Sequence, residues 1–171
     1  MVVTFRSVLA TIVNRAIRDV IGKRGELIVE LRLSDYANFP APLFSTTHLG
    51  QKWPAVDFYV ELATVAGKRP FFLAQAKSTA SACSRTNLRI SSTKQDIERL
   101  LEIPAPTYLL GIHEPTKRVF VRAVHKGSAV KAITRIPLAY ELTSQNLKAL
   151  HNEVVRFWGK GKHKPTGSIF S

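Results

Sequence analysis

Apolar and polar positions alternate with a helical period over the first part of the chain. Between Phe5 and Ile21 the apolar residues recur three or four positions apart, and Arg15 and Arg18 fall mostly on the opposite face. This pattern predicts an amphipathic helix. Gly22 to Gly25 interrupts it, and a second helical stretch follows, in which Glu26 and Glu30 lie one turn apart on a shared face.

Two further segments have the period of strands. Residues 54–62 and 71–77 are rich in aromatic and β-branched residues and are separated by a turn-like stretch, so they predict a β-hairpin. Alternation places Asp57 on the polar side of the first strand and puts Gln75 and Lys77 on one side of the second. If the register brings the open end of the hairpin together, a carboxylate and a polar oxygen can converge on one cation beside an ammonium group.

The rest of the chain continues the mixed pattern. A first strand is expected at 43–48 and a polar loop at 78–87. A helix is expected at 88–102, strands at 107–112 and 118–124, a closing helix at 144–158, and a basic, flexible tail at 159–171. This order predicts an α/β protein, a three-layer α/β/α sandwich around a mixed central sheet. We expect one domain over 1–158 with its core at about 20–125.

Charge narrows the choice of partner. The chain has 171 residues, 45% of them hydrophobic, and carries 25 Lys and Arg against 12 Asp and Glu, a net charge of +13. That balance favours a polyanion, above all nucleic acid, although a peripheral membrane protein or a ribosome-associated protein would also carry it. The single cysteine, Cys83, excludes an intramolecular disulfide and fits a reducing compartment, so we expect a cytoplasmic protein with no membrane span and no targeting segment.

The order of Glu26, Asp57 and Gln75-Ala76-Lys77 resembles the PD-(D/E)XK, restriction-endonuclease-like superfamily. In that superfamily an acidic residue on an N-terminal helix joins an Asp at one strand and a D/E-X-K triplet on the next. The Gln in the triplet is similar to the variant found in Mrr-type restriction enzymes and in several small uncharacterised nuclease-like families. The resemblance covers roughly residues 20–125.

The resemblance implies a catalytic site and a cofactor. Asp57, Gln75, the Ala76 carbonyl and Glu26 would hold Mg²⁺, with Mn²⁺ as a substitute, and Lys77 would orient the attacking water. The implied activity is endonucleolytic hydrolysis of DNA, duplex or branched, in a restriction, repair or defence system. RNA as substrate, a homodimer, and a protein partner that supplies specificity all stay open.

Two positions depart from the family pattern. Val56 stands where Pro precedes the Asp, which concerns backbone shape rather than chemistry. Gln75 replaces a carboxylate, so the site presents two carboxylates instead of three and should bind a hard cation more weakly. A non-catalytic nucleic-acid-binding module on the same fold, or a structural RNA-binding protein, is therefore the alternative.

Several residues have a second interpretation. Asp57 and Lys77 could form an exposed cross-strand ion pair, and Glu30 could take the place of Glu26. Trp53 could stack on a base, although core packing is the favoured expectation. The candidate contacts to the DNA backbone are the basic residues around the hairpin and the following helix, for which a solvated surface is the alternative: Lys52, Arg85, Arg89 and Lys94.

Overall fold

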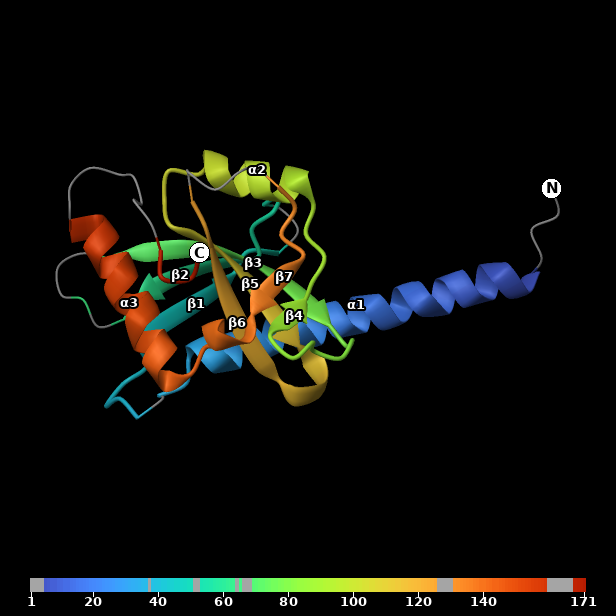
Figure 1. Cartoon of the computed structure of the whole chain (residues 1–171), viewed down its shortest axis with the longest axis horizontal. Coiled ribbons are helices and arrows are strands. Elements are labelled where there is room, and N and C mark those ends of the chain that lie inside the picture. The colour runs from blue at the N-terminus through green and yellow to red at the C-terminus, as the bar shows by residue number, and fades with distance from the viewer. Residues whose placement is uncertain are drawn as a thin grey trace.

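The computed structural model describes residues 5–36, 38–50, 53–63, 65, 69–125, 131–159 and 168–171, with side chains from residue 15 onward (Figure 1). The helices are α1 (Phe5–Leu33), α2 (Lys94–Glu102) and α3 (Ser144–Gly159), with short 3-10 helices at Glu114–Thr116 and Leu138–Tyr140. The strands are β1 (Phe44–His48), β2 (Phe58–Leu62), β3 (Phe71–Thr79), β4 (Asn87–Arg89), β5 (Thr107–His113), β6 (Arg118–Val124) and β7 (Arg135–Pro137).

Helix α1 is one continuous helix, and the expected break at Gly22 to Gly25 is wrong. A glycine inside a helix is less favourable than alanine by only about 1 kcal/mol, which tertiary packing can outweigh. Here Val29 and Leu33 are buried in the core and anchor the second half of the helix. The first half extends away from the rest of the protein (Figure 1).

The five strands of the main sheet lie in the order β1-β2-β3-β5-β6. Strands β2 and β3 form the predicted antiparallel hairpin, in which Phe58 pairs with Ala74. Strands β3 and β5 are parallel, and all other neighbours in this sheet are antiparallel. The predicted mixed sheet is therefore confirmed, and the start of β2 lies beside the middle of β3.

Helices pack on both faces of this sheet. On one face, α1 and α3 contribute to a core with Phe72, Tyr108 and Leu110. On the other face, α2 packs with Leu73 and Leu109. The chain is thus a mixed α/β fold, as the sequence predicts.

Helix α2 is shorter than expected. The predicted helix at 88–102 is wrong over its first residues, because Asn87–Arg89 forms strand β4 and pairs with β7 in a second, two-stranded sheet. The helix begins only after Thr93, whose side chain accepts a hydrogen bond from the Asp96 amide while the Asp96 carboxylate accepts one from the Thr93 amide. This reciprocal capping box fixes the first turn of the helix.

The end of the chain packs against the domain. Phe170 is buried, its carbonyl accepts a hydrogen bond of 3.0 Å from the Ala123 amide on β6, and the Tyr140 hydroxyl donates to the Ser171 carbonyl. Residues 168–171 therefore differ from the flexible tail expected for 159–171. The lysines of this segment lie outside the described residues. Among the described helices, none is long and apolar enough to cross a membrane.

Candidate active site

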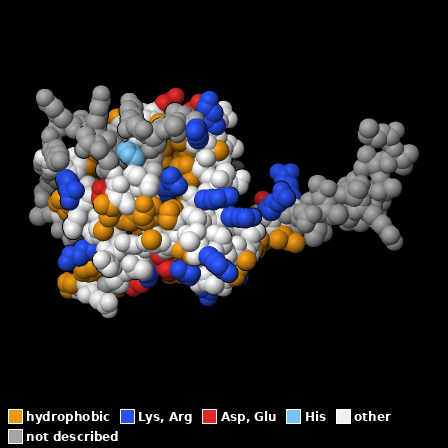
Figure 2. Space-filling model, viewed as in Figure 1, with side chains coloured by type: hydrophobic (Ala, Val, Ile, Leu, Met, Phe, Trp, Pro, Cys, Tyr) orange, Lys and Arg blue, Asp and Glu red, His pale blue; other side chains and the backbone are white. Residues whose placement is uncertain are grey.

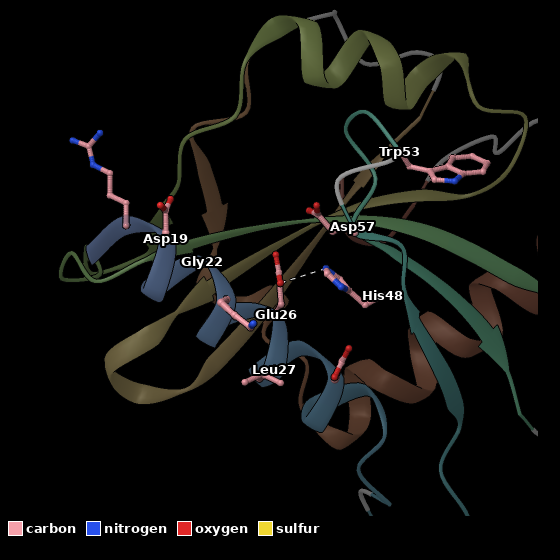
Figure 3. Close-up of a pocket in the computed structure, with 11 residues that line it drawn as sticks. Asp19, Gly22, Glu26, Leu27, His48, Trp53 and Asp57 are labelled. Carbon is pink, nitrogen blue, oxygen red and sulfur yellow. Dashed lines mark ion pairs between the residues drawn. The ribbon is translucent and has the colours of Figure 1, made fainter. Parts of the chain in front are cut away.

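A cleft of about 680 Å³ lies between α1 and the segment that leads from β1 to β2 (Figure 3). Glu26 reaches into it from α1, and Asp57 lies at the head of β2. The cleft thus brings together two residues that are far apart in sequence. Its lining residues are Arg18, Asp19, Gly22, Lys23, Glu26, Leu27, Glu30, His48, Gly50, Trp53 and Asp57.

Asp57 is tied to β3 through both its backbone and its side chain. Its amide donates to the Ala74 carbonyl at 2.9 Å, and its Oδ2 accepts from the Ala76 amide at 2.7 Å. The amide and carbonyl of one strand residue point to the same side of the strand, so the Ala76 carbonyl also faces the Asp57 side of β3. The hairpin therefore holds the Asp57 carboxylate against the Ala76 amide, on the side of β3 that the Ala76 carbonyl also faces.

The Asp57 carboxyl is harder to ionise than an exposed one. Burial raises its pKa, because the charged form loses hydration. The hydrogen bond from the Ala76 amide and the positive charges of Lys77 and His48 work in the opposite direction, but burial outweighs them. The surroundings of Asp57 therefore disfavour its charged form overall, and such perturbed carboxyl groups are common in functional sites.

Gln75 is almost fully buried, with 4% of its surface exposed. Its Oε1 is buried and has no hydrogen-bond partner among the described residues. A buried acceptor without a partner is unfavourable by about 1–3 kcal/mol and needs an explanation.

Lys77 has a partner that the sequence analysis did not anticipate. Its Nζ lies 3.3 Å from Oδ2 of Asp96, the residue of the first turn of α2 that pairs with Thr93 in the capping box. Partial burial disfavours ionisation of Asp96, but the hydrogen bond from the Thr93 amide and the Lys77 charge outweigh it, so the pKa of Asp96 is lowered. Among the ion pairs of the described residues, Lys77 pairs with Asp96 and not with Asp57, so the alternative interpretation as a cross-strand ion pair does not apply. The spacing of Thr93 and Asp96 before an apolar run was the signal that could have revealed this residue.

Glu26 and Glu30 both line the cleft, but only Glu26 among them has a described partner at its inner wall. Its Oε2 lies 3.3 Å from Nε2 of His48 (Figure 3). The His48 ring packs on Phe58, with ring centroids 5.3 Å apart. His48 was not predicted as a site residue, because histidine at the end of a strand has no distinctive spacing. Its position next to Glu26 follows from the packing of α1 against β1, which sequence alone does not give.

Trp53 is 55% exposed and lines the cleft, so the favoured expectation of core packing is wrong. Ala55 adopts a positive φ of 65°, which turns the chain and lets Val56, rather than Trp53, enter the core. An exposed indole beside a polar cleft is free to contact a ligand.

The candidate DNA-contacting residues lie on the surface. Arg85, Arg89 and Lys94 are exposed, and Lys94 pairs with Glu98 one turn along α2 at 3.4 Å. Lys52 lies outside the described residues. Lys and Arg dominate the charged side chains on the face of the protein seen in Figure 2.

Comparison of the chain with models of protein families, with curated proteins and with solved structures finds no match. Within the described ranges, no group of three or more His, Cys, Asp or Glu side chains could hold a metal ion. The candidate donor set is of another kind, since an amide oxygen and a backbone carbonyl supply part of it.

Proposed function

We propose that the protein is a Mg²⁺-dependent endonuclease that hydrolyses DNA phosphodiester bonds on a restriction-endonuclease-like α/β/α fold. The observation that carries this proposal is the buried, unpartnered Oε1 of Gln75 on the strand where Asp57 bonds to Ala76, two residues from Lys77. Most buried acceptors in folded proteins are hydrogen-bonded, so the Gln75 oxygen is a position where a bound cation could supply the partner.

The residues fit a hard cation. Mg²⁺ prefers oxygen ligands, and Asp57, the Ala76 carbonyl, the Gln75 amide and Glu26 supply only oxygens. A cation would give the Gln75 oxygen its missing partner and would offset the unfavourable burial of the Asp57 charge. When bound, it supplies charge neutralisation at the phosphate and lowers the pKa of water.

The remaining work belongs to side chains of the chain itself. Lys77 carries a positive charge at the end of the hairpin, where it can orient water and stabilise negative charge that develops on the phosphate. Asp96 limits the motion of Lys77, because their ion pair of 3.3 Å holds the ammonium in place. Asp57 must be ionised to act as a ligand, so activity should fall at acidic pH sooner than for an ordinary aspartate.

The net charge of +13 favours DNA as the substrate, since cationic side chains gain affinity through the release of counterions from phosphates. We place this activity in a reducing compartment such as the cytoplasm, in keeping with one unpaired cysteine.

A non-catalytic nucleic-acid-binding module is the second candidate. Two observations favour it: the neutral Gln75 at a position where a carboxylate would bind metal more tightly, and the engagement of Lys77 by Asp96. Both would be expected if the site had lost its catalytic role while its fold and basic surface were retained.

One experiment separates the two candidates. Supercoiled, linear, branched and single-stranded DNA, and RNA, are incubated with the protein in Mg²⁺, Mn²⁺ or EDTA. Asp57→Asn and Lys77→Met are compared with Glu102→Gln, which removes one charge from an exposed position of α2. The endonuclease proposal expects metal-dependent cleavage by the wild type and by Glu102→Gln but not by the two site variants.

Two results would contradict the proposed site or activity. Cleavage that survives both Asp57→Asn and Lys77→Met would exclude the assigned residues. Binding without cleavage in any metal would favour the binding module. Calorimetric titration with Mn²⁺ adds a measurement that does not depend on activity, because the wild type should bind the ion more tightly than Asp57→Asn.

A further inference from the structure

The two-stranded sheet of β4 and β7 presents two arginines side by side. Leu88 pairs with Ile136 and Arg89 pairs with Arg135 in its antiparallel register. Leu88 and Ile136 are fully buried. Because successive residues of a strand point to opposite faces, both arginines face away from the core, and both are exposed.

This small sheet, the basic ribbon, covers β5 next to Lys77 of β3. Its buried residues press on Gly111, where an added Cβ would lie 2.8 Å from side-chain atoms of both Leu88 and Ile136. Gly111 is the β5 partner of Lys77 in the parallel register. The ribbon therefore covers the sheet one strand away from the proposed catalytic lysine.

The charges of the ribbon are not balanced. Like charges directly opposite each other on neighbouring strands are destabilising. In the part of the chain that the structure describes, neither the Arg89 nor the Arg135 side chain has an ion-pair partner. Arg122 brings a third guanidinium to the same place by donating to the Arg135 carbonyl at 3.1 Å.

A hollow of about 330 Å³ beside the ribbon continues this basic surface. Arg122, Lys131 and Arg135 line it together with mainly apolar and small residues, and no Asp or Glu is among its described lining residues. The arrangement concentrates positive charge where folding alone gains nothing from it.

We propose that Arg89 and Arg135, supported by Arg122, bind the phosphate backbone of duplex DNA and hold it over the candidate active site. This inference rests on the proposed nuclease function. Duplex DNA is the partner because it carries one negative charge per ~1.7 Å of its axis, twice the charge density of one of its strands. Guanidinium groups pair with phosphates through two hydrogen bonds and read no base, so this contact sets position rather than sequence preference.

The test is the salt dependence of DNA binding, measured in EDTA by fluorescence anisotropy with a labelled duplex. Arg89→Gln/Arg135→Gln is compared with Lys148→Gln/Arg156→Gln, which removes the same charge from exposed positions of α3 on the opposite face of the sheet. Each phosphate contact contributes about 0.9 to the slope of log affinity against log salt concentration. Loss of two contacts should make the slope of the ribbon variant shallower by about 1.8. The ratio of wild-type affinity to variant affinity should therefore fall about twelve-fold between roughly 50 and 200 mM salt.

The control variant should keep the wild-type slope. Equal slopes for the ribbon variant and the α3 variant would overturn the proposal. It would also be overturned if the ribbon variant lost affinity only for single-stranded DNA, or if the wild type bound anionic lipid vesicles more tightly than DNA. Thermal unfolding shows whether the ribbon variant is folded, and its midpoint should equal or exceed that of the wild type because a repulsive pair is gone. Binding in EDTA needs no hydrolysis. If the ribbon variant shows the expected change in slope but the protein cleaves no DNA, the nuclease proposal is contradicted and the duplex contact is not.

Discussion

Two glycines in α1 should respond in opposite ways to the same substitution. Gly22 and Gly25 lie one turn apart in a continuous helix, and both were expected to interrupt it. A Cβ added at Gly22 meets no described atom within 4 Å. A Cβ added at Gly25 would lie 1.7 Å from Oγ and 2.9 Å from Cβ of Ser78 on β3.

The magnitude follows from these distances. Alanine is better than glycine inside a helix by about 0.8–1.0 kcal/mol, so Gly22→Ala should stabilise the protein by about that amount. At Gly25 the same gain is opposed by a clash. The Ser78 hydroxyl can rotate away, but its Cβ cannot, so α1 must move from β3 by about 0.5 Å to reach ordinary contact at 3.4 Å. Overpacking of this kind is unfavourable by about 1–3 kcal/mol.

Helix propensity cancels when the two variants are compared. Gly25→Ala should therefore be less stable than Gly22→Ala by about 1–3 kcal/mol in chemical denaturation. Displacement of the helix should also move the adjacent Glu26 away from His48 and weaken any activity of the cleft. Ser78→Ala removes the Oγ contact and should restore part of the loss in Gly25→Ala. Equal stabilities of the two alanine variants would refute the close approach of α1 to β3.

Three further predictions concern the site itself. Asp57→Asn should be at least as stable as the wild type at neutral pH. The carboxyl pKa is raised in the folded protein, so the free energy of unfolding falls as pH rises from the unfolded pKa to the folded one. Chemical denaturation from pH 3 to 8 should show a smaller fall in the variant. The effect of Asp96 on stability is opposite, because its pKa is lowered in the folded protein. Its carboxylate stabilises the fold above the unfolded pKa, and this contribution is lost as pH falls through the folded pKa. In the same assay, Asp96→Asn should therefore lose less stability than the wild type as the pH is lowered. Gln75→Glu should lower the Mg²⁺ concentration for half-maximal cleavage, Gln75→Ala should raise it, and no change in a metal titration of Gln75→Glu would argue against ligation.

The hairpin was predictable because its signal is local. Alternating apolar residues in 54–62 and 71–77 specify two strands, and a short connection makes them antiparallel neighbours. The position of Asp57 next to Ala76 then depends only on register, which the apolar face fixes by burying Phe58 opposite Ala74.

Contacts between elements distant in sequence were not predictable. The sequence around Gly25 predicts a break in the helix. The position instead requires glycine because α1 packs closely on Ser78, which lies on a strand 53 positions later. His48 meets Glu26, and Asp96 meets Lys77, only once the helices have packed on the sheet. No periodicity of a single segment carries that information.

Three unfavourable features of the described residues lie at or next to the open end of the hairpin. Burial raises the pKa of the Asp57 carboxyl, and the Gln75 oxygen has no hydrogen-bond partner among the described residues. On the basic ribbon, Arg89 lies directly opposite Arg135. A fold under selection for stability alone would lose such features, because each has a neutral or apolar substitute of similar size. A cation between the oxygens and a phosphate backbone across the arginines would compensate them together. Asp57→Asn and Arg89→Gln/Arg135→Gln should therefore separate stability from binding: stability should rise or stay unchanged, while binding of the cation or of DNA should weaken.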